Sequence, residues 1–271
     1  MTGAASGIGA ATAIRLGASG WRVIGVDKDG GAGPDDVVAD LGKPEERRRV
    51  VDEVAERSGG TLAGVVTCAG LAWHPGRPGS LLAHVNYFGT VDLLEGLRPL
   101  LTPGGAGVAI SSNSTTVQPG IPAELVEACL DHDEERAARI ADEQGSLTTY
   151  PATKMAVAYW VRKAAAGPDW AGARIRLNAI APGMIDTPMV AAMRAEAETA
   201  VGLEMLPIPL GRPGRPEEIA ALVEFLLGPD SSFFCGSVVF CDGGSDAVLR
   251  TRDWPAAWGI SVRALGRQLS D

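Results

Sequence analysis

Three glycines near the amino terminus constrain the fold of this chain more than any other feature. Gly3, Gly7 and Gly9 precede a helix-forming segment, 10–18, and a β-rich run, 21–26, follows that segment. Glycine allows a tight turn and a close approach of the backbone to other atoms. A glycine turn, a helix and a strand in this order are typical of a βαβ unit, which predicts a parallel sheet flanked by helices.

The same turn predicts a phosphate-binding site. Free N–H groups at a helix N-terminus attract a pyrophosphate, and glycine leaves room for it. Asp27 ends the β-rich run, where it can bind both hydroxyls of an adenosine ribose and repel a 2′-phosphate, so NAD is favoured over NADP. The alternative is a glycine-rich turn that only caps a helix. The predicted cofactor-binding residues here are Gly3, Ser6, Gly7, Ile8, Gly9 and Asp27.

One part of the βαβ unit is missing from the sequence. Such a unit begins with a strand before the glycine turn, but only Met1 and Thr2 precede Gly3. We therefore expect the first strand to be truncated. A shortened or mis-assigned start explains this best, because the pattern downstream is intact.

Strand-like and helix-like segments alternate along the rest of the chain. Short apolar runs are typical of buried parallel strands, and amphipathic segments of the helices between them. This alternation predicts one domain, 1–271, with an α/β fold: a Rossmann-type doubly wound parallel sheet flanked by helices. The expected strands are 37–40, 62–70, 107–113, 175–180 and 237–244, and the expected helices are 44–58, 81–97 and 216–228.

Three segments do not fit a plain alternation. A helical, acidic insert covers about 117–146, and we expect a solvated surface helix, a lid, or a block over a surface used for association. Residues 191–206 are expected to form a helical flap. The tail, 247–271, contains Trp254 and Trp258, which pack on a partner subunit unless the tail is partly disordered.

Tyr150 and Lys154 are the strongest catalytic candidates. Their spacing of four places both side chains on one face of a helix. An ammonium beside a phenol favours the phenolate, so we expect the pKa of Tyr150 to fall from its usual value of about 10. Such a tyrosine can exchange a proton with an alcohol or carbonyl oxygen. The alternative is an ordinary pair on a helix surface.

Several polar or small residues accompany this pair at positions where a ligand would reach them. Ser111 and Ser112 end an expected strand, at the sheet edge where α/β proteins bind ligands. Ala69 and Gly70 end another and can admit a cofactor closely. Asn86 lies within an expected helix, where asparagine is unfavourable; it is either solvated or holds a water by displacing regular backbone bonds.

Composition excludes several classes of protein. A net charge of -9 argues against nucleic-acid binding, which requires a basic face. No apolar run reaches the roughly 20 residues that cross a bilayer, and no signal peptide is visible. The cysteines are scattered, so we expect no metal site, no disulfide framework and a cytoplasmic protein. They are Cys68, Cys129, Cys235 and Cys241.

Taken in order along the chain, these motifs resemble the short-chain dehydrogenase/reductase family. The resemblance spans nearly the whole sequence, and within the family it is most similar to bacterial 3α-hydroxysteroid dehydrogenase/carbonyl reductases. Each motif is weak alone, but the full set in order is specific. The residues that carry it are Thr2-Gly3, Gly7-Ile8-Gly9, Asp27, Asp40, Cys68-Ala69-Gly70, Asn86, Ser112, Tyr150, Lys154, Pro182-Gly183, Thr187 and Asp242-Gly243-Gly244.

The resemblance implies an NAD-dependent enzyme that interconverts a secondary alcohol and a ketone, possible substrates being hydroxysteroids or other bulky carbonyl compounds. It implies a catalytic tetrad of Asn86, Ser112, Tyr150 and Lys154, in which Tyr150 is the acid or base. It also implies a homodimer or homotetramer. Further cofactor contacts carried over from the family are Asp40, Leu41, Cys68, Ala69, Gly70, Tyr150, Lys154, Pro182, Gly183, Ile185 and Thr187.

The sequence departs from the family pattern at two further points. Cys68 stands where the family usually has asparagine, so a side-chain bond that steadies the sheet is lost. The insert lengthens the spacing from Ser112 to Tyr150 and would cover the helices through which the family usually dimerises, so a different interface is expected.

Two other functions remain open from the residues alone. A non-catalytic NAD-binding regulatory protein would use the same fold but would not need the complete tetrad. A methyltransferase also combines a glycine turn with an acid after the second strand, but it has no use for the Tyr150–Lys154 pair.

Overall fold

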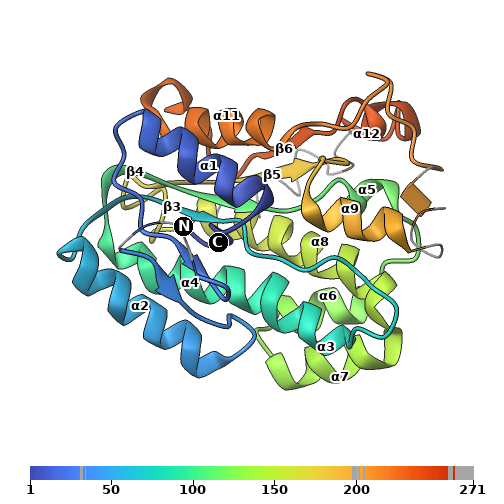
Figure 1. Cartoon of the computed structure of the whole chain (residues 1–271), viewed down its shortest axis with the longest axis horizontal. Coiled ribbons are helices and arrows are strands. Elements are labelled where there is room, and N and C mark those ends of the chain that lie inside the picture. The colour runs from blue at the N-terminus through green and yellow to red at the C-terminus, as the bar shows by residue number, and fades with distance from the viewer. Residues whose placement is uncertain are drawn as a thin grey trace.

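The computed structural model describes residues 1–30, 33, 35–196, 200, 202–203, 205–255 and 259. Parallel strands form its centre, in the order β2-β1 and β3-β4-β5-β6. Helices cover both faces of the sheet (Figure 1), which confirms the predicted Rossmann-type fold. The strands are β1 (Val26–Asp27), β2 (Val37–Val38), β3 (Leu62–Thr67), β4 (Leu101–Ile110), β5 (Arg176–Pro182) and β6 (Val238–Cys241).

Thr2 joins the two parts of the sheet. It forms parallel bridges to Val26 on β1 and to Thr67 on β3. Its N–H donates to the Val66 carbonyl at 2.9 Å, and the Val26 N–H donates to the Met1 carbonyl at 2.8 Å. Met1 and Thr2 therefore lie between β1 and β3 and link them into one sheet.

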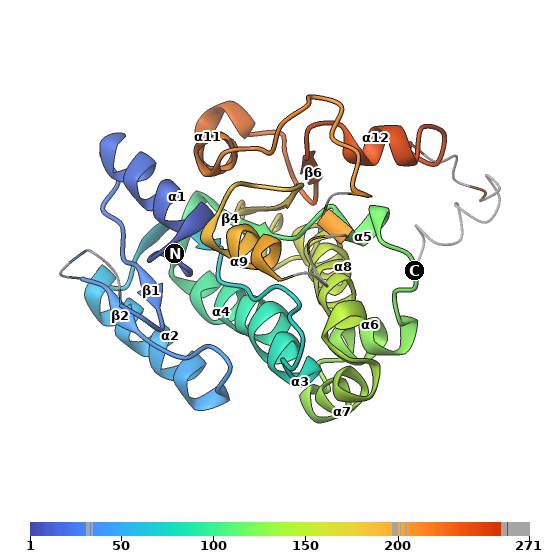
Figure 2. The same ribbon diagram turned by 45° about the vertical axis from the view of Figure 1, so that its right-hand side comes forward.

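One layer of helices packs on the sheet through α1 (Gly7–Ala18) and α11 (Pro216–Leu227). These two helices lie side by side in both views (Figures 1 and 2), and Arg15 pairs with Glu224 between them. Leu16 and Val223 belong to the apolar cluster on this face. The glycine turn thus begins a helix that is held firmly on the sheet.

The other face is covered by α2 (Pro44–Ser58), α4 (Gly89–Leu97) and α8 (Ser146–Ala165). Their buried side chains form the larger apolar cluster, which includes Val50, Leu94 and Val157. α2 begins with Pro44 and ends where Gly59 takes a left-handed conformation, as a helix with a glycine C-cap does. The described elements of the chain also include α3 (Gly79–Leu82), η2 (Arg98–Leu100), α5 (Ser114–Val117), α9 (Pro188–Ala195), η3 (Pro229–Ser231) and α12 (Ser245–Leu249).

The insert forms two helices, α6 (Ala123–Leu130) and α7 (Glu134–Gln144). The chain turns between them at His132, whose φ of 58° is unusual for a residue with a side chain. Leu125, Cys129 and Ala141 are buried against the body of the protein. The insert is therefore a packed outer layer beside α8 (Figure 2) rather than a solvated helix.

The expected helix 81–97 is interrupted. Residues Ala83–Phe88 form a π-helical segment, η1, between α3 and α4. π-Helical turns are rare in proteins, and those that occur are frequently found at functional sites.

Of the other expectations, the strand at 107–113 begins earlier and ends at Ile110. Trp258 lies outside the described residues, and among those that are described no helix is long and apolar enough to cross a membrane.

Candidate active site

The catalytic helix α8 contains a proline near its start. Pro151 has no N–H to donate to the Leu147 carbonyl four residues earlier. The Gln118 side chain donates to that carbonyl at 3.1 Å instead. The helix therefore continues through Pro151, and Tyr150 and Lys154 lie one turn apart, as their spacing predicts.

Tyr150 faces the end of β4. The Ser112 hydroxyl hydrogen-bonds Tyr150, which lowers the pKa of the phenol, but burial raises that pKa by more. The net direction is upward, so the expected fall in the pKa of Tyr150 is wrong for the protein alone. Desolvation disfavours the phenolate, and the Lys154 ammonium points elsewhere. Without cofactor, Tyr150 is a protonated acid at neutral pH.

Lys154 is buried, with 4% of its surface exposed. Its ammonium donates to the Ile110 carbonyl at 2.9 Å, and burial lowers the pKa of Lys154 to about 8. The Ser111 hydroxyl, expected to face a ligand, instead donates to the Lys154 carbonyl at 2.8 Å. Ser111 thus fastens α8 to the sheet, and only Ser112 reaches Tyr150.

Asn86 is fully buried, which excludes the first of its two predicted alternatives, a solvated side chain. Its side chain accepts from the Leu71 N–H at 2.7 Å and donates to the Leu71 carbonyl at 3.0 Å. A Cβ on Gly70 would lie 3.3 Å from both Asn86 Oδ1 and Lys154 Nζ. The π-helical segment therefore carries Asn86 to the loop after β3 and brings it beside Lys154.

The glycine turn packs closely on its surroundings. Gly3 has a φ of 68°, and a Cβ there would lie 2.7 Å from the Ala69 nitrogen. A Cβ on Gly9 would overlap the Gly3 carbonyl oxygen. Only glycine is tolerated at these two positions, which leaves the backbone N–H groups at the start of α1 open to a ligand.

The Asp27 carboxylate lies at the carboxyl end of β1, beside the glycine turn. One of its oxygens accepts from the Ala5 N–H at 3.0 Å, and the other from the Asp29 N–H at 3.2 Å. The two bonds hold the carboxylate in place beside α1. An acid in this position matches the predicted ribose site.

The remaining predicted cofactor residues lie along the same edge of the sheet. Asp40 and the buried Leu41 follow β2, and Cys68 to Gly70 follow β3. Pro182 ends β5, and a Cβ on Gly183 would lie 2.6 Å from Asp242 Cα. Ile185 is buried, whereas the Thr187 hydroxyl accepts from the Val190 N–H at 3.3 Å and so caps α9.

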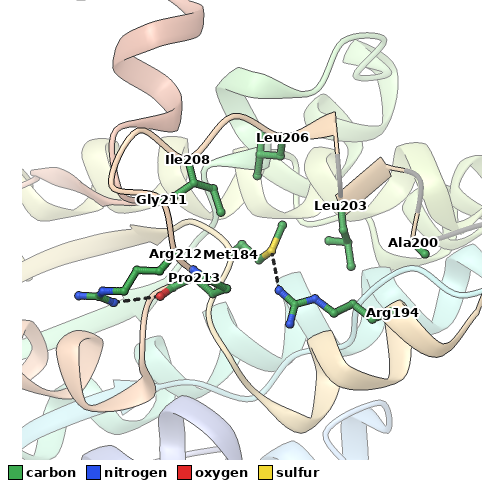
Figure 3. Close-up of a pocket in the computed structure, with 9 residues that line it drawn as sticks. All are labelled: Met184, Arg194, Ala200, Leu203, Leu206, Ile208, Gly211, Arg212 and Pro213. Atoms are coloured by element: carbon green, nitrogen blue, oxygen red, sulfur yellow. Dashed lines mark hydrogen bonds between the residues drawn. The ribbon is translucent and has the colours of Figure 1, made fainter.

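The glycine turn and the loop after β5 lie close together along this edge. Gly7 and Thr187 are so near that a Cβ on Gly7 would lie 3.3 Å from the Thr187 methyl carbon. A cavity of about 400 Å³ lies next to this region, between the loop after β5 and the part of the flap that is described (Figure 3). Met184, Arg194 and Leu206 line it. It lies beside the predicted site and contains none of the tetrad residues.

Two positioning features could not be found from side-chain motifs. The carbonyl of Ile110 holds Lys154, and the backbone of Leu71 holds Asn86. Both are backbone groups, for which the sequence carries no signal. The Gln118 bond to Leu147 depends on where the insert folds, which is equally invisible in the sequence.

Comparison with known proteins defines the class. A family profile described as Enoyl-(Acyl carrier protein) reductase matches residues 3–124 and 136–246. The unmatched residues between these ranges fall in the insert. The chain belongs to the short-chain dehydrogenase/reductase family, whose members similar to it are dehydrogenases and reductases of alcohol and ketone groups.

Among individual proteins, the chain is similar to 3-alpha-hydroxysteroid dehydrogenase/carbonyl reductase of Comamonas testosteroni, at 35% identity over 92% of this chain and 96% of that protein. It is 32% identical to cis-4-hydroxycyclohexanecarboxylate dehydrogenase of Sinomonas cyclohexanicum, over 92% of this chain and 96% of that protein. The solved structure of 3-alpha-hydroxysteroid dehydrogenase from Pseudomonas sp. B-0831 complexed with NADH covers 93% of this chain and 98% of its own, with 40% identity and a TM-score of 0.87. That relative shares the fold of this chain and was solved with NADH bound.

Proposed function

We propose that the protein reduces a ketone to a secondary alcohol with NADH, and catalyses the reverse reaction with NAD⁺, through Tyr150 as acid and base. The observation that carries the proposal is the convergence of Ser112, Tyr150, Lys154 and Asn86 at the carboxyl edge of the sheet. In reduction, Tyr150 gives its proton to the substrate oxygen while the hydride reaches the carbon. Ser112 donates to the same oxygen and stabilises its developing charge.

The cofactor would lie along the strand ends, with the fit set by this chain's own residues. The glycine turn leaves N–H groups for the pyrophosphate, and Lys154 is near enough to Gly70 to reach a ribose in that place. The cofactor supplies the hydride when bound, while the protein orients it and excludes water. Asn86 holds the loop after β3, from which it can position a water for proton relay.

The preference for NAD over NADP rests on Asp27. Its carboxylate is held by two backbone N–H groups at the end of β1. A 2′-phosphate in the same place would bring its negative charge against the Asp27 carboxylate, which disfavours NADP.

Transfer of a labelled hydride tests the reaction and the cofactor together. With NADH deuterated on the transferred face of C4 and a panel of cyclic ketones, we expect the alcohol to carry one deuterium on its carbinol carbon. NADH should support this at least ~10-fold better than NADPH, which is about 1.4 kcal/mol of discrimination. An alcohol that lacks the label, or equal rates with NADPH, contradicts the corresponding part of the proposal.

The substrate class and assembly are proposed from the relatives. Their names include hydroxysteroid and hydroxycyclohexane substrates, so we propose a bulky cyclic alcohol or ketone. We also propose a homodimer or homotetramer that does not use the side of α8 covered by α6, because the insert already buries that surface. Light scattering measures the assembly, and a monomer would contradict it.

A further inference from the structure

The cavity of about 400 Å³ beside the proposed cofactor site combines an apolar lining with two cationic side chains. We call it the flap cavity. An apolar lining with a few placed polar groups is typical of a small-molecule site, in which the polar groups fix the orientation of the ligand. The apolar residues here include Met184, Ala200, Leu203, Leu206 and Ile208, and the cations are Arg194 and Arg212.

One wall of the flap cavity is joined to the ends of two strands. The Gly214 N–H donates to the Met184 carbonyl at 2.9 Å, just after β5, and the Asp186 N–H donates to the Gly214 carbonyl at 2.8 Å. The Leu210 N–H donates to the Gly243 carbonyl at 3.1 Å, just after β6. This wall is thus held at the carboxyl edge of the sheet, where open α/β sheets bind their ligands.

The opposite wall begins beside the proposed cofactor site. The helix α9 starts after Thr187, which lies close to Gly7 in the glycine turn. Arg194 lies in the last turn of the same helix, roughly 10 Å from Thr187 along the helix axis at 1.5 Å per residue. A ligand in the flap cavity can therefore extend from the proposed nicotinamide position toward Arg194.

The two cations of the flap cavity have different partners. Arg212 donates to the Glu218 carboxylate at 2.6 and 2.9 Å, so its charge is neutralised. Arg194 instead reaches toward Met184 and donates to its sulfur at 3.3 Å (Figure 3). A thioether is a weak acceptor and carries no charge. Among the residues that the structure describes, no carboxylate pairs with Arg194.

A guanidinium without a charged partner beside an apolar cavity favours an anionic ligand. Its donors match the two oxygens of a carboxylate. Arg194 is exposed, so a ligand can reach it from solvent. The chain as a whole carries a net charge of -9, so the attraction for an anion is local to this side chain and not a property of the whole surface. The matching ligand has an apolar body and one negative group.

We propose that Arg194 binds a carboxylate of the substrate, and that the substrate is a cyclic oxo acid or hydroxy acid whose ring occupies the flap cavity. This inference rests on the proposed function, because it names the substrate class of the same site. The carboxylate replaces the Met184 sulfur as the partner of Arg194 and directs the other end of the ring toward the proposed nicotinamide position. Arg194 is therefore a specificity-determining residue and takes no part in proton or hydride transfer.

An acid and its methyl ester test the proposal, because they differ by one negative charge. With 4-oxocyclohexanecarboxylate or 3-oxocholanate, we expect a kcat/KM at least ~10-fold higher for the acid than for its ester, which is about 1.4 kcal/mol. Added salt should lower this ratio, because it screens an exposed charge.

Variants of Arg194 should change the ratio of acid to ester in a graded way. We expect a ratio near one for Arg194→Gln, a ratio below one for Arg194→Glu, and part of the preference to remain in Arg194→Lys. Arg162, exposed in the last turn of α8, provides the matched control. Arg162→Gln removes the same charge outside the cavity and should keep the ratio of the wild type.

Binding without turnover separates this inference from the proposed function. Cyclohexanecarboxylate and cholanate have no oxo group, so calorimetric titration of the NADH-loaded protein with them needs no reaction. We expect Arg194→Gln to weaken the binding of at least one of them by ~10-fold or more, which is about 1.4 kcal/mol, and Arg162→Gln to leave it unchanged. If the wild type binds such an acid through Arg194 and reduces no ketone, the proposed function fails and the carboxylate site stands.

Two results would overturn the inference while leaving ketone reduction in place. One is a wild type that reduces both esters as efficiently as the acids. The other is an Arg194→Gln variant with the same preference for the acid, and the same affinity for it, as the wild type.

Discussion

Lys154 is an ammonium in a buried place, and no carboxylate pairs with it in the part of the chain that the structure describes. Its bond to the Ile110 carbonyl satisfies one of three donors. Burial of an incompletely partnered charge costs stability, and burial lowers the pKa of this group to about 8. Such a cost is common where a residue is retained for function.

The sign of the resulting pH dependence follows from the two pKa values. The pKa of Lys154 is about 8 in the folded protein, below its ordinary value of 10.5, so the folded state binds fewer protons than the unfolded state between pH 8 and pH 10.5. Stability therefore rises with pH across this window. Replacing Lys154 with Met removes the charge and the pH dependence together.

We expect the melting temperature of Lys154→Met, taken relative to that of the wild type at the same pH, to be higher at pH 7 than at pH 10. The loss of the bond to Ile110 costs about 1 kcal/mol at every pH and does not affect the comparison. Thermal unfolding of the two proteins without cofactor, at pH 7 and at pH 10, measures this difference in melting temperature. A difference between the two proteins that is constant with pH would contradict the buried-charge explanation.

At the scale of elements, the insert supports the catalytic helix. The Thr149 hydroxyl donates to the Ala141 carbonyl at 3.2 Å, which ties α8 to α7. The Ser80 N–H donates to the Asp142 side chain at 2.8 Å, which ties α7 to α3. The end of the insert is thus fixed between the start of α8 and the start of the helix that carries Asn86.

Gly79 is where α3 meets α7. A Cβ on Gly79 would lie 1.9 Å from the Ala141 carbonyl oxygen, whereas Gly17, exposed on α1, has nothing within 4 Å. We expect Gly79→Ala to destabilise the protein by about 1–3 kcal/mol through overpacking. Gly17→Ala is the matched control and should be neutral or stabilising by up to ~1 kcal/mol. Denaturant unfolding compares them, and equal effects would show that the contact is not tight.

The sequence predicts elements better than it predicts contacts between them. The Tyr150–Lys154 spacing, the glycine turn and the strand ends are local patterns, and the structure confirms their placement. The π-helical segment at Asn86 and the break at His132 depend on packing against distant residues. The pKa of Tyr150 was predicted in the wrong direction because burial, which sequence spacing does not reveal, raises it by more than the Ser112 hydrogen bond lowers it, and the Lys154 ammonium donates to the Ile110 carbonyl instead.

At the scale of the whole molecule, Arg47 on α2 connects three helices from two layers. It is 1% exposed, and it pairs with Asp92 on α4 at 2.8 Å and with Glu134 on α7 at 2.5 Å. Glu134 also contacts His84 at 2.6 Å. Because one guanidinium pairs with acids from two elements, this buried group adds an ionic connection between the insert and the body.

We expect Arg47→Met to destabilise the protein by about 3–5 kcal/mol, because it leaves two acids near the core without their cation. Arg49 on the same helix pairs with Glu46 and Glu53 but is 40% exposed, so Arg49→Met should cost less than ~1 kcal/mol. Denaturant unfolding of the two variants tests this. Equal losses in the free energy of unfolding would mean that the buried ion pairs of Arg47 stabilise the protein no more than the exposed ion pairs of Arg49.

The central claim is that Tyr150 exchanges the proton with substrate while other groups bind the cofactor. Tyr150→Phe removes only the hydroxyl, so turnover of a ketone with NADH should fall by roughly 10²–10⁴-fold. NADH affinity, measured by fluorescence titration of the same preparation, should change by less than about threefold, which is under 1 kcal/mol. Turnover within tenfold of the wild type would contradict the assignment, and so would a loss explained entirely by weaker NADH binding.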